Sequence, residues 1–413
     1  MSTSTPKLAK GEAPARLTPT SKEIPFSDAR VRDPSVDYLR AFIVLLVLLH
    51  HSVLAYATFW SAQPRIFTVT PAPVVDPQRW GGFDLLVLFN DTFFMALLFL
   101  LSGLFVWPSL ERKGGARFLH DRILRLGLPF AVAVGLLMPL AYFPSYAATG
   151  ADPGFLAYAR AWLSLGFWPS GPAWFIWLLL VFDAVVAGTY VLRRRRNAKA
   201  RTGGNFGVYG RPTAFVATLI VVSALVYIPM ELAFGAERWL TLGPFSFQAS
   251  RLLLYAAYFL IGLRIGASGT ELGFLARRWP AWAAAGLAAY ALRVAVLITL
   301  VLPVADAHRP LPLTFRLLSG LTFVLCCGTI SFAFLAFFRR FVVAHHPAFD
   351  SLSVSSYGMY LIHYPIVVWL QYALLTVALS PIAKGTIVFV AAVGFSWGTV
   401  VALRRVPVVT RVL

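Results

Sequence analysis

Residues 37–57 read DYLRAFIVLLVLLHHSVLAYA, an apolar run that begins with charged residues and contains two adjacent histidines. From residue 39 the run continues for about 20 residues, enough for a helix to cross a hydrocarbon core of roughly 30 Å. The sequence therefore predicts a transmembrane helix here. The same kind of stretch recurs along the chain, and this recurrence decides the fold class.

Ten apolar stretches, bounded by proline, glycine or charge, are predicted to span a membrane. Their limits are 39–58, 84–107, 126–143, 172–192, 213–230, 251–267, 280–302, 313–338, 355–378 and 384–403. The predicted fold class is an all-α integral membrane protein of about ten transmembrane helices. Residues 1–36 are predicted to be a disordered basic arm, 37–405 the transmembrane domain and 406–413 a short tail.

The composition supports this class and excludes a soluble fold. Of the 413 residues, 59% are hydrophobic and only 13% are charged, whereas soluble domains average about 25% charged residues. The formal net charge is nevertheless +19. Most Lys and Arg lie in the arm, the tail and alternate loops, the pattern of cytoplasmic loops. The sequence therefore predicts a multi-pass membrane protein with both termini cytoplasmic, in contact with lipid and not with nucleic acid.

Two ionisable residues of the first span share one face. Arg40 and His51 are eleven residues apart, which at about 100° per residue leaves them roughly 20° from alignment and about 16 Å apart along the axis. Asp37 lies three residues before Arg40, so the two side chains are expected to pair. His50 falls off this line, so His51 is the histidine aligned with Arg40.

This arrangement suits a long ligand with a charged head. A guanidinium at the cytoplasmic mouth can bind phosphate, and a deep imidazole can accept a proton as a general base. The structural alternative is that neighbouring helices simply satisfy both groups. Ionisable residues within spans are costly and usually functional, which favours a site at Arg40 and His51.

Other polar residues inside spans are weaker candidates. His363 is predicted in the ninth span, Asp91 near the outer end of the second, and Asp183 and Arg293 are considered as an ion pair between helices. Arg122 and Arg125 are three residues apart and would form one basic patch on a helix. Either positive-inside topology or a nucleotide-phosphate site explains that patch, and composition does not choose between them.

Several motifs are absent. The sequence has no P-loop, no G-x-S-x-G, no CxxC and no H-E-x-x-H, so phosphoryl-transfer, serine-hydrolase and zinc chemistry lose support. The two cysteines are adjacent within an apolar run and are expected to be inert. We therefore expect no metal cofactor.

The motifs resemble a known family in their order along the chain. Arg40, ten residues and His51 match the Arg-x10-His signature of the acyltransferase-3 family of polytopic membrane O-acyltransferases. Further similar segments are FLLSG at 99–103, Phe118 with Arg122, Arg125 and Pro129, Trp174-Phe175, and SYGMYLIH at 356–363. The resemblance covers about residues 34–405 and implies a protein of the bacterial inner membrane. Within the family, the HHS and FND segments and the Trp-containing outer loop are similar to a branch that succinylates periplasmic glucans.

The resemblance implies transfer of an acetyl- or succinyl-type group from a cytoplasmic acyl-CoA to a hydroxyl of an extracytoplasmic glycan or glycolipid. His51 would be the general base, Arg40 would hold the donor's phosphates, and Asp37 would orient Arg40. Arg122 and Arg125 would assist at the phosphates. Secondary candidates for substrate binding are Trp174, Tyr360 and His363, although Trp174 is equally explained by the interfacial aromatic belt.

Two other classes of function remain open at this point. A transporter or exporter of an envelope precursor would also place ionisable residues inside spans, but no internal repeat is visible in the sequence. A non-catalytic scaffold would tolerate substitution of Arg40 and His51. Acyl transfer is the favoured hypothesis.

Overall fold

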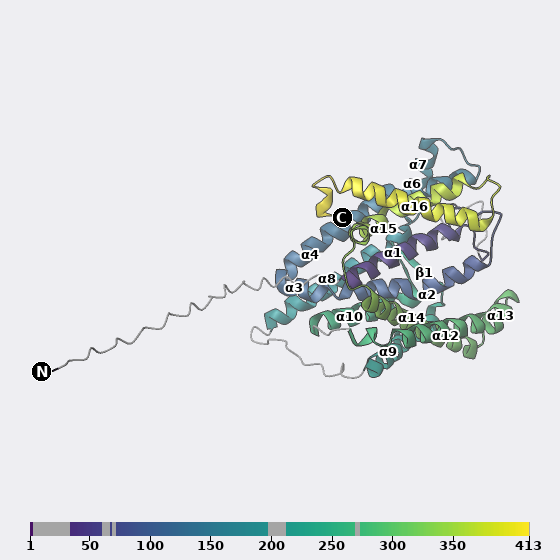
Figure 1. Cartoon of the computed structure of the whole chain (residues 1–413). Helices are drawn as coiled ribbons and strands as arrows, with labels where there is room; N and C mark the ends of the chain where they lie inside the picture. The colour runs from purple at the N-terminus through teal and green to yellow at the C-terminus, as the bar shows by residue number, and fades with distance from the viewer. Residues whose placement is uncertain (3–33, 60–66, 68–71, 197–211, 269–272, 413) are drawn as a thin grey trace. The chain divides into compact units, whose positions relative to one another are not determined.

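The computed structural model describes residues 1–2, 34–59, 67, 72–196, 212–268 and 273–412. Most of the predicted arm, residues 1–36, lies outside these ranges. Contacts separate residues 1–33 from a compact unit of residues 34–413, and the description below concerns this second unit. It is a helical bundle with one small hairpin (Figure 1).

The α-helices begin and end at the following residues. They are α1 (Pro34–Leu54), α2 (Gly82–Gly103), α3 (Val106–Lys113), α4 (Gly115–Arg122), α5 (Leu128–Val132), α6 (Met138–Ala148), α7 (Phe155–Leu163), α8 (Trp174–Arg196), α9 (Pro212–Phe234), α10 (Leu252–Ser268), α11 (Gly273–Ala276), α12 (Trp279–Val296), α13 (Leu302–Asp306), α14 (Leu313–Phe341), α15 (Pro347–Ala373) and α16 (Pro381–Leu403).

Nine helical stretches among the described residues are long and apolar enough to cross a membrane. They coincide with nine of the ten predicted spans and confirm an all-α multi-pass membrane protein. Most are longer than expected: the third, for example, runs from Gly115 to Ala148, whereas the sequence predicted 126–143. The reason is that polar turns at the helix ends remain helical although their composition resembles that of a loop.

The predicted ninth span, 355–378, corresponds to α15, a long helix that is less apolar than these nine stretches. This helix begins earlier than expected, at Pro347, and its first half is rich in serine. Ser353, Ser355 and Ser356 are nevertheless buried, because α15 packs against α1, α6 and α16. Its polar residues therefore face neighbouring helices.

Three π-helical turns interrupt the long stretches. They are η1 (Ile123–Gly127), η2 (Ala133–Leu137) and η6 (Leu297–Val301). Each is followed by a proline at the second residue of the next helix, Pro129, Pro139 and Pro303. A proline lacks the N–H of the α-helical ladder and its ring crowds the preceding turn, so a wider turn relieves the clash.

Helices α2 and α10 cross at very close range. A Cβ placed on Gly262 would lie 2.0 Å from the carbonyl oxygen of Leu100, and one on Gly266 would lie 2.1 Å from that of Leu104. Gly103 approaches the backbone of Phe259 in the same way. Small residues four apart let two membrane helices bring their backbones together.

The one hairpin of the described residues precedes α10. Strand β1 (Trp239–Leu242) pairs antiparallel with β2 (Phe245–Gln248), with Trp239 opposite Gln248. Gly243 in the turn has a φ of 58°, a conformation that favours glycine. A short 3-10 turn, η5 (Ala249–Arg251), joins the hairpin to α10.

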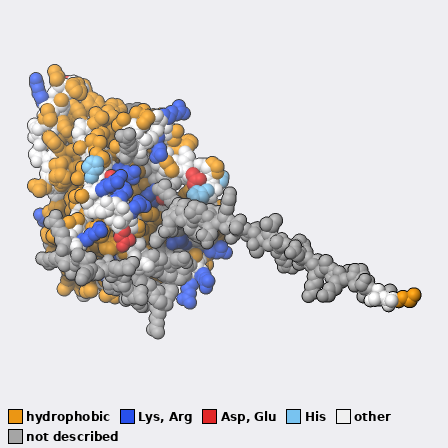
Figure 2. All heavy atoms as spheres, turned by 90° about the vertical axis from the view of Figure 1, so that its left-hand side faces the viewer, with side chains coloured by type: hydrophobic (Ala, Val, Ile, Leu, Met, Phe, Trp, Pro, Cys, Tyr) orange, Lys and Arg blue, Asp and Glu red, His pale blue; other side chains and the backbone are white. Residues whose placement is uncertain are grey.

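Basic side chains gather at one end of the bundle. Contacts there join α3 to α8 through Trp107 and Tyr190, and join the end of α16 to α15 through a 2.9 Å bond from Arg404 to the carbonyl of Val354. Figure 2 views the molecule from the left-hand side of Figure 1 and shows Lys and Arg grouped on this face, with apolar side chains around them. We call this end of the bundle, where Trp107, Tyr190, Val354 and Arg404 lie, the arginine-rich end.

Candidate functional site

The first helix carries the predicted stripe. α1 continues without interruption from Pro34 to Leu54, so Arg40 and His51 keep the spacing of about 16 Å. Arg40 Nη2 lies 3.1 Å from Asp37 Oδ1, an ion pair with the guanidinium one third exposed and the carboxylate nearly buried. The predicted pairing of Asp37 with Arg40 is therefore confirmed.

The second contributor is α15, which lies beside α1. Ser353 Oγ donates to the carbonyl of Asp37 at 3.2 Å. At the start of the same helix, Tyr38 Oη donates to Asp350 Oδ1 at 2.6 Å and accepts from the backbone N–H of His346 at 2.8 Å. These bonds fix the relative register of the two helices at the arginine-rich end.

At the other end of the stripe, two histidines meet. The ring centroids of His51 and His363 are 5.3 Å apart, and the ring of Tyr364 lies 5.2 Å from that of His51. The side chain of His363 is fully buried, and its Nδ1 lies 2.7 Å from the carbonyl oxygen of Tyr360. A carbonyl only accepts, so Nδ1 carries the proton and Nε2 is left as an acceptor. No described residue bonds to that Nε2.

The hydrogen bonds that hold His51 go to its backbone. Gln371 Nε2 donates to the carbonyl of His51 at 2.8 Å and to that of Ser52 at 3.1 Å. The Nδ1 of His51 is buried and has no hydrogen-bond partner among the described residues. The residue as a whole is half-buried, so its imidazole is fixed in position with one ring nitrogen unbonded.

His50 faces a different part of the bundle. Its ring lies 5.2 Å from that of Phe94 on α2, and the charged side chains that act on it are Asp91 and Arg251. The side chains of the two neighbouring histidines therefore lie in different environments. These contacts show that His50 and His51 face different helices, as the 100° between successive residues predicts.

Tyr360 lies between the histidine pair and the start of α8. Its hydroxyl donates to the carbonyl of Pro172, and its ring centroid lies 5.8 Å from that of His363. Trp174, two residues beyond Pro172, stacks on Tyr255 at 5.5 Å and lies edge-on to Trp239 at 5.7 Å. The predicted substrate-binding residues therefore fall into two groups: Tyr360 and His363 beside His51, and Trp174 in an aromatic cluster.

Arg122 and Arg125 take different roles. Arg122 Nε lies 3.1 Å from Asp183 Oδ2, and Asp183 is fully buried. The considered ion pair of Asp183 with Arg293 is therefore wrong. Arg125 lies in the π-turn η1 with an exposed side chain, and its carbonyl accepts a hydrogen bond from Tyr357.

One face of α15 connects these features. Ser353, Tyr357, Tyr360 and Tyr364 follow one another at spacings of four, three and four, which places them on one helical stripe. In order they contact Asp37, Arg125, Pro172 and His51, as given above. The stripe therefore links the arginine-rich end with the histidine pair.

Sequence reasoning missed two ion pairs: in one both side chains are buried, and in the other Arg251 is buried whereas the Asp91 side chain is 38% exposed. Lys384 Nζ lies 2.7 Å from Asp76 Oδ2 with both side chains almost fully buried, and Arg251 Nη2 lies 2.5 Å from Asp91 Oδ2. Lys384 stands at the start of a span and resembles a loop charge. Arg251 does likewise, and Asp91 lies near the outer end of its span. Only the position of these side chains inside the bundle shows that they are paired, and the composition of the sequence does not reveal that position.

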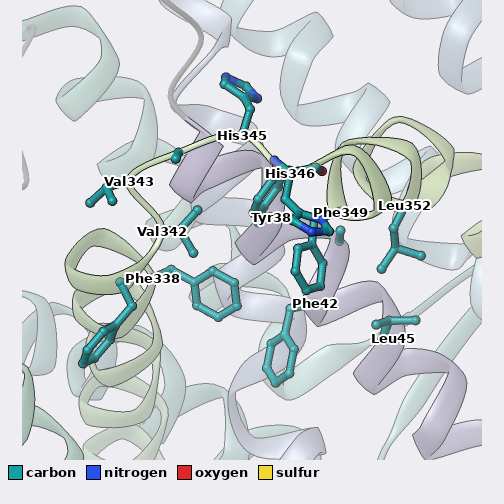
Figure 3. A pocket seen from close by; sticks show the side chains of 13 residues that line it. Tyr38, Phe42, Leu45, Phe338, Val342, Val343, His345, His346, Phe349 and Leu352 are labelled. Carbon is teal, nitrogen blue, oxygen red and sulfur yellow. Dashed lines mark hydrogen bonds between the residues drawn. The ribbon is translucent and has the colours of Figure 1, made fainter.

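A cavity of about 450 Å³ lies on a different face of α1 (Figure 3). Tyr38, Phe42 and Leu45 line it together with Phe338 of α14 and Phe349 of α15. At 100° per residue these α1 positions point well away from the line of Arg40 and His51. The cavity is therefore separate from the candidate site.

In the described part of the chain, no group of three or more His, Cys, Asp or Glu residues is arranged to hold a metal ion. The site offers imidazole, hydroxyl and guanidinium groups. Imidazole can transfer a proton, and guanidinium can bind an anion.

Comparison with known proteins identifies the family. A family model described as an acyltransferase domain, of the acyltransferase-3 type, matches residues 33–401. The chain belongs to the acyltransferase-3 family. The matched region contains α1 to α16 almost entirely, so both the Arg40–His51 stripe and the α15 stripe lie within the acyltransferase domain.

Curated relatives of this acyltransferase-3 chain share a name. Glucans biosynthesis protein C from Salmonella paratyphi B and from Salmonella enteritidis PT4 are each 25% identical over 247 residues, which cover 56% of this chain and 57% of the relative. The protein of that name from Salmonella schwarzengrund is 24% identical over the same length. The chain thus spans little more than half the length of these relatives. No solved structure matches it.

Proposed function

We propose that this acyltransferase-3 protein moves an acyl group of the acetyl or succinyl type from a cytoplasmic acyl-CoA to a hydroxyl of an extracytoplasmic glycan or glycolipid. One observation carries the proposal. The imidazole of His51 stands about 16 Å along a continuous helix from Arg40, an arginine at the arginine-rich end. A second helix, α15, lies beside it over that length.

The donor would enter at the arginine-rich end. Arg40 is held by Asp37 and remains one third exposed, which suits recognition of a phosphate by a guanidinium. Arg125 adds an exposed charge nearby, and Arg122 is oriented by Asp183. A thin arm reaching from the phosphates towards His51 would carry the thioester to the histidine pair.

At the histidine pair, His51 would act as the general base. It would take the proton of the acceptor hydroxyl while that oxygen attacks the thioester carbonyl. The C–O ester bond forms, the C–S bond breaks, and the departing CoA sulfur takes up the proton. His363, with Nε2 free to accept, and Tyr360 would orient the acceptor, whereas Trp174 would contact a sugar ring further out.

The orientation and acceptor follow from charge and from the relatives. Basic loops remain on the cytoplasmic side of bacterial membranes, so the arginine-rich end would face the cytoplasm in the inner membrane. His51 would then lie towards the opposite face, where envelope glycans and lipid-linked sugars are available. The glucan biosynthesis named for the relatives supports a glycan acceptor.

The test uses the purified full-length protein in lipid nanodiscs. Release of free CoA thiol from acetyl-CoA and from succinyl-CoA is followed with a glucan oligosaccharide as acceptor. We expect His51→Ala to lower acyl transfer by about 10²–10⁴-fold, the usual contribution of a positioned base. His50→Ala is the matched control because it removes the neighbouring imidazole, and with acetyl-CoA, a donor without a free carboxylate on its acyl group, it should retain most of the activity.

Mass spectrometry of envelope glycans and lipids, from cells with and without the gene, identifies the acyl group and the acceptor. Equal loss of activity in His50→Ala and His51→Ala would mean that the wrong face was chosen. Unchanged glycan acylation in His51→Ala, at normal membrane abundance, would refute the role of His51. A transporter or scaffold would consume no thioester in the purified assay.

A further inference from the structure

A second polar cluster, mostly buried, lies close to His50. Its charged members come from four elements: Asp91 of α2, Arg251 of η5, Glu231 of α9 and Arg293 of α12, and the two arginines lie over the ring of Phe323 of α14. Helices α2, α9 and α12 all pack against α14 (Figure 1). No step of the proposed acyl transfer uses these residues.

The two arginines of this cluster share one aromatic ring. The guanidinium carbon of Arg251 lies 5.0 Å from the centroid of Phe323, and that of Arg293 lies 4.9 Å from it. Both side chains are more than nine-tenths buried. Cations over an aromatic face are stabilised by its quadrupole, but a shared ring does not neutralise either charge.

Only one of the two cations, Arg251, has a described carboxylate within ion-pair distance. Arg251 donates to Asp91 Oδ2 at 2.5 Å and to the Asp91 carbonyl at 2.9 Å, and Glu237 stands 3.9 Å away. Arg293 has no ion pair with any described carboxylate. Its hydrogen bond is from Nη1 to the carbonyl of Ser319 at 3.2 Å, and its Nε has no described partner.

Other polar atoms around this cluster lack partners too. Asn90, fully buried, has neither its amide nitrogen nor its oxygen bonded to a described residue, and the same holds for Nδ1 of His50 and Nε of Arg251. Buried polar groups are rarely left unbonded. A concentration of them beside an unpaired buried cation indicates a place that a polar ligand occupies.

The charges define the chemical class of that ligand. A guanidinium recognises a carboxylate or a phosphate through a planar fork of N–H donors. Here Asp91 and Glu231 stand close to the two arginines, and their negative charges would repel a phosphate dianion more strongly than a singly charged carboxylate. The cluster therefore favours a carboxylate.

We propose that Arg293 and Arg251 form a carboxylate-binding subsite beside His50. The subsite connects to the reaction through α1, because His50 immediately precedes His51 in the chain. The carboxylate belongs either to the far end of the transferred acyl group or to an acidic residue of the acceptor glycan. Only this choice of source rests on the proposed function, because binding itself is independent of acyl transfer.

Binding is tested first, without any reaction. Thermal unfolding of the full-length protein in nanodiscs is measured with succinate, and with its uncharged diamide as the probe that lacks the carboxylates. We expect succinate, but not the diamide, to raise Tm, and Arg293→Gln to abolish this shift. Arg293→Lys keeps the charge without the fork and should weaken the shift.

A matched control is Arg404→Gln, which removes another arginine bonded to a single backbone carbonyl at the arginine-rich end; it should leave the succinate shift unchanged. If succinate gives no shift in the unmodified protein, or the same shift in Arg293→Gln, the subsite is refuted. The succinate shift of the unmodified protein needs no variant. It therefore tests the proposal even if Arg293→Gln does not fold.

The source is then distinguished by activity. If the carboxylate is on the acyl group, Arg293→Gln should raise KM for succinyl-CoA at least about tenfold and leave KM for acetyl-CoA unchanged. If it is on the acceptor, both donors should be affected alike, and only with an acidic acceptor. If the unmodified protein shows the succinate shift in Tm but transfers no acyl group, the proposed function is refuted and the subsite still stands.

Discussion

Replacing Lys384 with methionine is expected to destabilise the protein strongly. Lys384 Nζ and Asp76 Oδ2 are 2.7 Å apart, and 1% or less of either side chain is exposed. Asp76 also receives a hydrogen bond at Oδ1 from the backbone N–H of Gln78 at 2.8 Å. The methionine would remove the cation and leave this carboxylate buried with one backbone donor.

The magnitude follows from the burial. A buried pair broken by removing one partner typically costs about 3–5 kcal/mol, because the remaining charge has lost its compensation. That corresponds to a factor of roughly 10² to 10⁴ in the unfolding equilibrium constant. Part of the loss should be local, because Asp76 N–H bonds to the carbonyl of Ala55 at 2.9 Å and so ties the segment around residue 76 to the end of α1.

A double variant separates the charge from the shape. Lys384→Met combined with Asp76→Asn removes both charges, so it should be more stable than Lys384→Met alone by at least about 1 kcal/mol of coupling. Lys113→Met is the control. Lys113 and Asp121 are 2.5 Å apart, but each is about one third exposed, and such pairs contribute about 1 kcal/mol or less.

Reversible denaturation in detergent micelles, followed by tryptophan fluorescence, gives the free energy of unfolding of all four proteins. If Lys384→Met costs no more than Lys113→Met, then water reaches the Lys384–Asp76 pair and the dry environment inferred from its burial is wrong. If the double variant is as unstable as the single one, the loss comes from packing of the lysine stem.

Two further predictions concern the bundle. Gly262→Val should abolish stable folding or lower Tm by many degrees, because a Cβ there meets the Leu100 carbonyl oxygen at 2.0 Å. Thermal unfolding measures this change. Gly394→Val is the control, because that glycine has open space around it. Arg122→Gln should cost about 3–5 kcal/mol by leaving Asp183 buried and unpaired, and adding Asp183→Asn should restore most of that stability; equal stability of the single and double variants would contradict the pairing.

The sequence predicted well whatever depends on local periodicity. The helices follow from runs of apolar residues, and the pairing of Asp37 with Arg40 follows from a spacing of three. The separation of His50 from His51 follows from the 100° turn between successive residues. Each of these depends on one helix alone, so no knowledge of neighbouring helices was needed.

Contacts between helices were not predictable in the same way. Asp183 was considered as a partner for Arg293, but the structure pairs it with Arg122, which stands in a basic segment that topology alone explains. Periodicity places a charge on a face and does not say which helix covers that face. Lys384 shows the same limit. A lysine at the start of a span is expected to be exposed from its hydropathy, but here it is buried in an ion pair with Asp76, a carboxylate from a loop.

The position of α1 explains how one helix serves several purposes. Successive residues diverge by about 100°, so His51 faces His363 on α15 while His50 faces Phe94 on α2, and Tyr38 and Phe42 face the separate cavity. A site built on one straight helix needs a fixed rotation of that helix about its axis. Hydrogen bonds hold that rotation: at one end of α1 Ser353 donates to Asp37 and Asp350 accepts from Tyr38, and at the other end Gln371 donates to His51. The polar residues of α15 are therefore best understood as the framework that keeps His51 directed at its partner.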